Sequence, residues 1–320
     1  MSRTNLISVS DEEAAVRELE ESGRYRIYRR VDLSRCLLPR AALPTRKAVF
    51  VDIESTGLDV GQSELIEIGI LPFEYQIDGT IVAIGEPQSY LNEPDSPIST
   101  KITQLTGITN EMVKGHRLDP EILTSILDEA AVVIAHNAAF DRPMAERYCA
   151  KFSVMPWVCS MTDIDWNREG LTSRRLSDLL AAYKLFFDAH RAIDDCEAGV
   201  ALLAQKANSS NECLLSLALE NARQATWRVF AMGVPYSNRT TFVDRGYRWN
   251  ADTTFGPKGW WIELREEALN SEREFMEAQL LCNSVQLDVR RLSALDRFTA
   301  RYSERSDIFP EHATPLLPLP

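Results

Sequence analysis

An apolar run that ends in two acidic residues is the feature that most constrains how this chain folds. Ala48-Val49-Phe50-Val51 is followed at once by Asp52, and Glu54 comes two positions later. The run predicts a core strand. Residues two apart on a strand leave the same face, so both carboxylates point to one side. Because an unpaired carboxylate is costly to bury, acids at the end of a core strand indicate a site.

Further strands and helices are expected on either side of this run. Residues 65–71 and 81–84 have strand character, and Asp78-Gly79 between them is a hairpin signal, which predicts three antiparallel strands. A short buried strand follows at 131–135. Helices are expected at 102–105, 120–127, 142–151, 176–185 and 194–206. This order predicts an α/β or α+β sandwich around a mixed sheet.

The length of 320 residues suggests about two domains. We expect a helical N-terminal extension at 1–46 and a main domain at 47–208, with the polar segment 208–211 as its boundary. A C-terminal module is expected at 211–301. It opens with an aromatic and basic stretch, which predicts a small hairpin, and continues as a helix from about 262. The Pro- and Leu-rich end, 302–320, is expected to lack fixed structure.

Composition excludes several classes of protein. The net charge of −12 argues against general coating of nucleic acids, although it permits a local basic patch. No apolar stretch approaches the roughly 20 residues that span a bilayer, and the N-terminus has no apolar signal core, so we expect no membrane association. The six cysteines are scattered without a Cys-x-x-Cys pair, which fits a reducing cytoplasm.

Two later segments add carboxylates to the first pair. His136-Asn137-x-x-Phe140-Asp141 follows the strand at 131–135, and His190-x-Ala-x-x-Asp195 opens a helix. Taken singly, Asp141 reads as a helix N-cap and His190 as a surface histidine. Taken together, four acids and one histidine at the ends of core elements indicate an open site for Mg²⁺ or Mn²⁺, which prefer oxygen ligands.

This set resembles the DEDDh (DnaQ-like) family of 3′–5′ exonucleases over about residues 47–207, and the Thr-Gly-Ile segment at 106–108 is similar to a loop of that family. The resemblance implies a ribonuclease-H-like fold with a mixed five-stranded sheet flanked by helices. It implies two divalent metal ions, Mg²⁺ or Mn²⁺, held by Asp52, Glu54, Asp141 and Asp195, with His190 as general base. Adjacent helical residues point about 100° apart, so only one of Asp194 and Asp195 can face the metal ions. The His-to-Asp spacing of the family implies that this residue is Asp195.

The same resemblance implies a substrate and a product. Water would attack a terminal phosphodiester at a 3′ end and release a nucleoside 5′-monophosphate. Thr56, Gly57 and Leu58 would receive the terminal nucleotide, and Asn137 and Phe140 are further candidates, although they also read as a loop cap and a core anchor. We expect DNA, single-stranded, with a polymerase or repair partner. An RNA-trimming enzyme and a non-catalytic binding subunit are the alternatives.

The C-terminal module carries many aromatic and basic residues between 223 and 261. Such a mixture suits single-stranded nucleic acid, since aromatic rings stack on bases and arginines follow the backbone. Candidate contacts are Arg245, Arg248, Trp249 and Lys258. The alternative is that the tryptophans form the core of a small domain.

Overall fold

The computed structural model describes residues 9–251, 256–280 and 285–299. The expectation of an unstructured tail at 302–320 lies outside the described residues. In the described part, no helix combines the length and the apolar character that crossing a membrane requires.

The centre of the molecule is a mixed sheet of six strands in the order β4-β3-β2-β6-β7, with β5 also paired to β3. The pairs β2–β3, β3–β4 and β3–β5 are antiparallel, whereas β2–β6 and β6–β7 are parallel. The bounds are β2 (Thr45–Ser55), β3 (Leu65–Gln76), β4 (Ile81–Ile84), β5 (Gln88–Leu91), β6 (Val132–Ala135) and β7 (Trp157–Cys159).

The expected mixed α/β fold is confirmed, with one strand more than the five expected. The extra strand arises at the edge, where the partner of β3 is divided into β4 and β5. Residues 85–87, Gly-Glu-Pro, separate the two, and the Gly85 amide bonds the Pro72 carbonyl.

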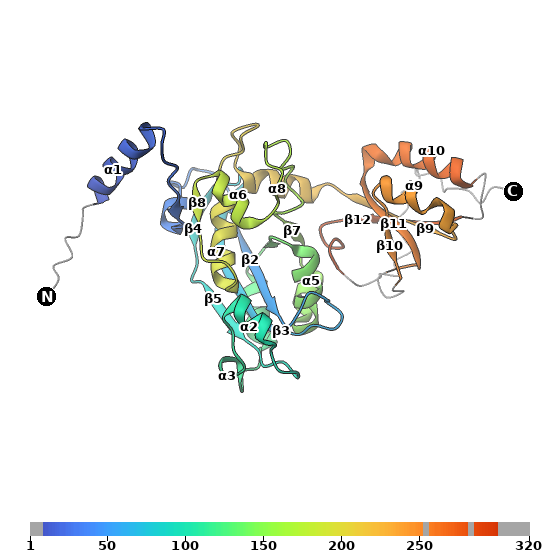
Figure 1. Ribbon diagram of the computed structural model, residues 1–320, viewed down its shortest axis with the longest axis horizontal. Coiled ribbons are helices and arrows are strands. Elements are labelled where there is room, and N and C mark those ends of the chain that lie inside the picture. The colour runs from blue at the N-terminus through green and yellow to red at the C-terminus, as the bar shows by residue number, and fades with distance from the viewer. Residues whose placement is uncertain (1–8, 252–255, 281–284, 300–320) are drawn as a thin grey trace.

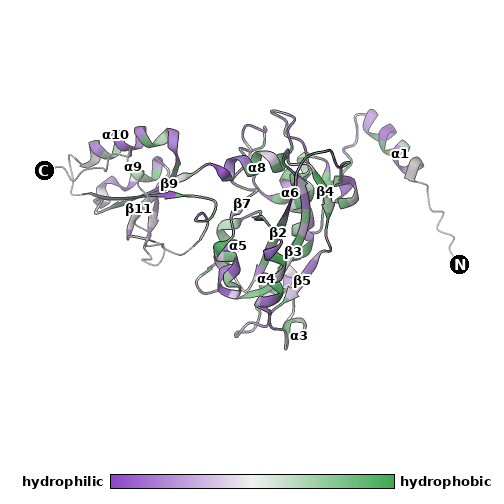
Figure 2. Ribbon diagram, turned by 180° about the vertical axis from the view of Figure 1, so that it is seen from behind, coloured by the Kyte–Doolittle hydropathy of each residue, from purple (hydrophilic) through white to green (hydrophobic). Residues whose placement is uncertain are grey.

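Helices cover both faces of the sheet (Figure 1). Alternation along β2 divides its side chains: Phe50 packs into one core with helices α7 and α8, while Val49 and Val51 pack into another with α4 and α5. Hydrophobic residues gather in these strands and on the helices that face them (Figure 2). The bounds of the helices are α2 (Thr100–Thr106), α3 (Asn110–Val113), α4 (Pro120–Asp128), α5 (Ala138–Tyr148), α6 (Leu176–Ala182), α7 (Ala192–Leu203) and α8 (Leu214–Arg223).

The polar segment 208–211 is an exposed loop, and buried residues of the first core lie on both sides of it, at Ala207 and Cys213. Helix α8 follows this segment, and its apolar side chains are buried with α7, the last of them at Ala222. The isolated bridge between Lys206 and Cys213 closes the segment into a loop. Buried residues of the first core therefore extend about a dozen positions past the polar break that the sequence suggested as a boundary.

The N-terminal segment contains helix α1 (Val9–Glu21), strand β1 (Arg29–Arg30) and the 3₁₀ helix η1 (Leu33–Cys36). Strand β1 pairs in parallel with β8 (Leu185–Phe186). The buried amide of Gln76 donates to the carbonyls of Ala41 and Leu43 and accepts from the Ala41 amide, so that it fastens the segment beside β3.

The C-terminal module is a second, four-stranded antiparallel sheet in the order β10-β11-β9-β12. Helices lie along it at the end of the molecule opposite α1 (Figure 1). The elements are β9 (Thr226–Met232), η3 (Tyr236–Asn238), α9 (Arg239–Asp244), β10 (Arg248–Asn250), β11 (Gly259–Arg265), η4 (Glu266–Ala268), α10 (Leu269–Leu280) and β12 (Gln286–Leu292).

The prediction of a continuous helix from about residue 262 is wrong. Strand β11 runs to Arg265, and α10 ends at Leu280. Residues 286–292 then form β12, because pairing with β9 satisfies their backbone groups along seven positions.

After β12, residues 293–299 return to the central domain, where Phe298 packs against the second core. We call them the return segment. Arg142 of α5 is fully buried and donates to the carbonyls of Leu295 and Arg297, both at 2.7 Å. Arg297 in turn pairs with the buried carboxylate of Asp163 at 2.6 Å. The return segment therefore connects the C-terminal module to helix α5.

Candidate active site

Asp52 and Glu54 project from β2 toward helix α7. They lie on the same side of the strand as Phe50, while Val51 and Ile53 point into the opposite core. Across the antiparallel ladder Asp52 faces Gly69 and Glu54 faces Glu67. The two carboxylates therefore stand side by side at the end of the strand, as the spacing in the sequence predicted.

Two glycines allow α7 to lie directly on the sheet. A Cβ on Gly69 of β3 would stand 2.5 Å from the carbonyl carbon and oxygen of Ala192 at the start of α7. A Cβ on Gly199 would stand 2.1 Å from the ring of Phe50 on β2. Because neither side chain is present, the first turn of α7 reaches the end of β2, and Asp195 reaches its carboxylates.

Three carboxylates meet at this point. One oxygen each from Asp52, Glu54 and Asp195 lies within 4.8 Å of the other two, which is a suitable spacing for a shared cation. Asp195 also accepts a 2.8 Å hydrogen bond from the backbone amide of His190, which holds its carboxylate in place. The three side chains come from two elements far apart in the chain.

Asp141 stands behind this group, in the first turn of α5 and only 3% exposed. Burial raises the pKa of its carboxyl to about 8, although backbone hydrogen bonds at Ile53 and Asn137 oppose the rise. Burial raises the pKa of the neighbouring Asp52 well above its ordinary value, and the surrounding acids raise it further. Among these acids, Asp141 contributes most to the rise.

The other two carboxyls show the same crowding. Burial, with the charges of Asp195 and Glu67, raises the pKa of Glu54 to about 8. Burial raises the pKa of Asp195 to about 6, against the hydrogen bond from His190. Four acids that all resist ionisation need a positive charge among them, and carboxylate oxygens are the ligands of hard divalent cations. The side chains present therefore fit such an ion.

His190 lies at the mouth of this group on the segment before α7. It is exposed, and its φ of 75° is in the left-handed region, which is uncommon for a residue with a side chain. This backbone conformation belongs to the turn that presents the His190 amide to Asp195.

Glu67 is a site residue that the sequence reading missed. Its side chain is fully buried and accepts hydrogen bonds from Arg191 at 2.9 Å, from Ser89 at 2.7 Å and from the Ala192 amide at 3.1 Å. Glu67 therefore caps the first turn of α7. An acid inside the otherwise apolar run Leu65–Leu71 was the available signal, because a buried charge requires partners.

The residues predicted to receive the terminal nucleotide lie in two places around the acids. The Thr56 hydroxyl accepts from the Glu64 amide and closes the loop after β2, and Leu58 in that loop is 89% exposed. Asn137 is exposed at the N-cap of α5 and makes no side-chain capping bond there. Phe140 packs partly against the second core. The Gly57 carbonyl accepts from the Ser55 hydroxyl at 2.6 Å.

The four candidate contacts in the C-terminal module differ in their surroundings. Arg245 is held by the Glu272 carboxylate, at 2.9 and 3.1 Å, and lies over the ring of Phe275. Arg248 lies over the ring of Trp261, and Lys258 is exposed. Trp249 is 51% exposed. Arg245 thus has a structural role within the module, whereas Trp249 presents an open ring.

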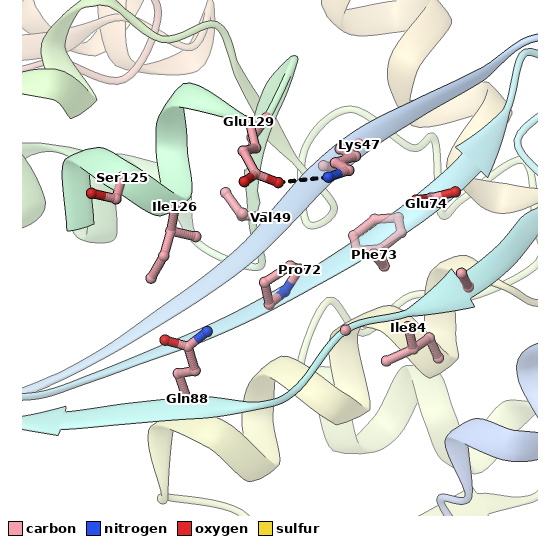
Figure 3. A pocket seen from close by; sticks show the side chains of 14 residues that line it. Lys47, Val49, Pro72, Phe73, Glu74, Ile84, Gln88, Ser125, Ile126 and Glu129 are labelled. Carbon is pink, nitrogen blue, oxygen red and sulfur yellow. Dashed lines mark hydrogen bonds and ion pairs between the residues drawn. The ribbon is translucent and has the colours of Figure 1, made fainter. Parts of the chain in front are cut away.

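A separate pocket of about 490 Å³ lies at the opposite end of β2. In Figure 3, Lys47 and Glu129, which both line the pocket, point toward one another and form an ion pair of 2.5 Å. Its lining residues come from the beginning of β2, from β3, from the edge strands β4 and β5 and from the end of α4, whereas the acids lie at the end of β2. This pocket is therefore distinct from the acidic site.

Residues 49–203 match a family model described as an exonuclease, RNase_T. Among curated proteins, the chain is similar to a DNA polymerase III of PolC type from Thermotoga petrophila, 30% identical over 162 residues, which cover 46% of this chain and 11% of that protein. The chain thus spans about a ninth of the length of this relative.

Among solved structures, similar proteins also match about half of this chain. Exonuclease X in complex with 5′-overhanging duplex DNA matches 54% of this chain and 99% of its own, at 26% identity and a TM-score of 0.39. The nuclease domain of 3′hExo, a DEDDh family member bound to rAMP, matches 51% of this chain and 92% of its own, at 15% identity and a TM-score of 0.41.

Proposed function

Residues 49–203 are an exonuclease domain of the DEDDh family, and from this premise we propose that the protein removes nucleotides one at a time from the 3′ ends of single-stranded DNA. The observation that carries the proposal is the meeting of Asp52, Glu54 and Asp195 within 4.8 Å, next to the buried Asp141. The reaction is hydrolysis of the terminal phosphodiester, and the product is a nucleoside 5′-monophosphate.

The four acids would hold two divalent cations, Mg²⁺ or Mn²⁺. When bound, such a pair of ions polarises a phosphate and stabilises the attacking and leaving oxygens of a displacement. The charges of Asp141, Asp195 and Glu54 all act on the Asp52 carboxylate, so the four acids would serve as one group of ligands. The protein contributes fixed oxygen ligands from β2, α5 and α7.

His190 would accept the proton of the attacking water. It is exposed five residues before Asp195, and histidine is the side chain that most often serves as a general base. The leaving 3′ oxygen would take its proton from solvent. The backbone amide of His190 binds the Asp195 carboxylate, which connects the proposed base to the acids that would hold the metal ions.

The terminal nucleotide would lie between the loop after β2 and the start of α5. Backbone groups of Thr56 and Gly57 would meet the sugar, and the exposed side chain of Leu58 would support the last base. Asn137 and Phe140 would border the same nucleotide from α5. DNA is proposed as the substrate because the similar curated protein is a DNA polymerase, and a polymerase or repair complex is the proposed partner.

The test measures release of mononucleotides from matched single strands of DNA and RNA, labelled at either the 3′ or the 5′ end. We expect early release of the 3′ label from DNA with Mg²⁺ or Mn²⁺ and none with chelator. Asp52→Asn should remove the release, whereas Asp188→Asn, at an exposed acid paired with Arg30, should keep it.

Three outcomes would contradict the proposal. Early release of the 5′ label would reverse the direction, and release in chelator would exclude a metal requirement. Faster digestion of RNA than of DNA would replace the substrate by RNA while keeping the chemistry.

A further inference from the structure

The C-terminal module has a cleft of its own, of about 550 Å³. It lies where η3 and α9 meet the β10–β11 edge of the second sheet. Its described lining residues are Val234, Tyr236, Arg239, Val243, Tyr247, Trp249 and Trp260. Four of these seven are aromatic, so the cleft offers flat apolar surfaces.

Two of the four aromatic rings face solvent. Tyr236 is 82% exposed and Trp249 is 51% exposed, whereas Tyr247 and Trp260 are buried with Phe242 and Met276 in the core of the module. The module therefore already has a packed aromatic core, and the open rings of Tyr236 and Trp249 are additional to it.

The orientation of Trp249 is fixed by the core beneath it. Its ring meets Trp260 edge to face, with centroids 5.4 Å apart and planes at 69°. Trp260 is held in turn by Phe242, which packs against Tyr247. A ring fixed in this way loses little conformational entropy when a flat ligand stacks on it.

The charge of the residues that line the cleft indicates what kind of planar ligand it could bind. Among its described lining residues Arg239 alone is charged, and its side chain is exposed. The nearby carboxylate of Glu272 is occupied by Arg245 and by the Tyr247 hydroxyl. An exposed cation beside two exposed rings fits a ligand that joins an aromatic face to a negative charge.

We propose that this cleft binds an unpaired base of a single-stranded nucleic acid, with its backbone phosphate on Arg239 and the base in contact with both exposed rings, Trp249 and Tyr236. The proposal rests on the proposed exonuclease function and names a second contact for the same strand, upstream of the terminal nucleotide. The return segment ties the module to α5, which carries Asp141, so one strand would be held at two places on connected elements.

The experiment measures the affinity of the full chain for a fluorescent 20-nucleotide oligo(dT) by anisotropy, in chelator so that no strand is cut. Tyr236→Ala and Trp249→Ala should each weaken binding at least about fivefold, from the usual contribution of one stacked base. Arg239→Gln should lower the slope of log affinity against log salt by about 0.7, from the loss of one phosphate contact. The matched control is Tyr25→Ala, an exposed tyrosine (52%) in the N-terminal segment, which should bind as the wild type does.

Because Trp249 contacts the core of the module, the folding of each variant is checked by thermal melting. Tyr236 and Arg239 are exposed, so the test depends on their two variants if Trp249→Ala has a lowered melting temperature. Wild-type affinity in both Tyr236→Ala and Arg239→Gln would overturn the proposal. So would displacement of the oligonucleotide by a peptide with the sequence Ala-Thr-Pro-Leu-Leu-Pro-Leu-Pro, since aromatic grooves also bind Pro-x-x-Pro segments.

The two proposals fail separately. A wild-type chain that binds the strand through these residues but digests no strand in Mg²⁺ or Mn²⁺ would remove the exonuclease function and keep the cleft. A chain that digests the strand while the cleft variants retain full affinity would keep the exonuclease and remove the cleft.

Discussion

Glu67 on β3 stands directly opposite Glu54 on β2, yet the pKa values of the two carboxyls shift in opposite directions. Burial raises the pKa of Glu54 to about 8. Burial also acts on Glu67, but hydrogen bonds from Arg191, Ser89 and the Ala192 amide outweigh it and lower its pKa. One acid of the pair is thus satisfied by protein, and the other is left for a cation.

Replacing Glu67 should therefore affect the site through α7. Glu67→Gln keeps the volume but removes the charge that holds Arg191 and the Ala192 amide, and we expect it to cost about 1–3 kcal/mol of stability. Because the first turn of α7 carries Asp195, the same variant should bind Mn²⁺ more weakly. Urea unfolding and a Mn²⁺ titration measure the two effects. The exposed Glu86→Gln is the control, and equal Mn²⁺ affinity in Glu67→Gln would show that the residue only stabilises the fold.

Asp194 and Asp195 are adjacent in the first turn of α7, and the geometry distinguishes them. Asp195 belongs to the group of three carboxylates, while Asp194 does not. Asp195→Asn should lower turnover by more than the roughly 10–100-fold typical of losing an outer partner of a ligand. Asp194→Asn should keep most turnover and cost about 0.3–1 kcal/mol of stability, from the helix dipole. Single-turnover assays on both variants measure these effects. A larger loss of turnover in Asp194→Asn than in Asp195→Asn would show that Asp194 is the metal ligand.

The crowded acids predict how stability depends on pH without metal. The pKa of Glu54 rises from 4.5 when unfolded to about 8 when folded, and that of Asp195 from 3.8 to about 6. Between these values the folded chain holds more protons than the unfolded chain, so its stability should fall as pH rises from about 4 to 8. Melting in chelator across this range measures the fall. Added Mg²⁺ or Mn²⁺ should raise the melting temperature more at pH 8 than at pH 5, and an equal rise at both would contradict the argument.

Gly69 gives a steric test of the same site. The Cβ of Gly69→Ala would lie 2.5 Å from the Ala192 carbonyl, which is backbone and cannot move aside alone. We expect α7 to be displaced and both metal affinity and turnover to fall. Gly61→Ala, whose Cβ would meet only the Asp59 carboxylate at 3.4 Å, is the matched control. Calorimetric titration with Mn²⁺ is the measurement, and unchanged affinity in Gly69→Ala would mean that the start of α7 adapts.

The part of the site that could be read from sequence is the part carried by short local patterns. Asp52 and Glu54 end a recognisable apolar run, and Asp141 and Asp195 open helices that follow strand or loop signals. Glu67 gave only the weaker signal of an acid within an apolar strand, and its role depends on Arg191, 124 residues away. Partners at that separation are set by the packing of α7 on the sheet, which local pattern does not encode.

The C-terminal half was harder to predict for a related reason. Residues 286–292 carry the alternating pattern of a half-exposed strand, but their state depends on β9, more than fifty residues earlier. The polar break at 208–211 had the composition of a linker, yet the leucines of α8 beyond it complete the first core. In both places long-range packing decided the outcome over local composition.

The return segment has a consequence for how the protein is made. The Arg142 guanidinium finds an acceptor at Arg297, 155 positions later in the chain. While the chain is still being translated, that guanidinium has Glu146 and the Ser153 carbonyl nearby but lacks the carbonyls of Leu295 and Arg297. The nuclease half can therefore reach its final state only after the ribosome has synthesised the second sheet, so the last residues described here complete the fold of the first domain.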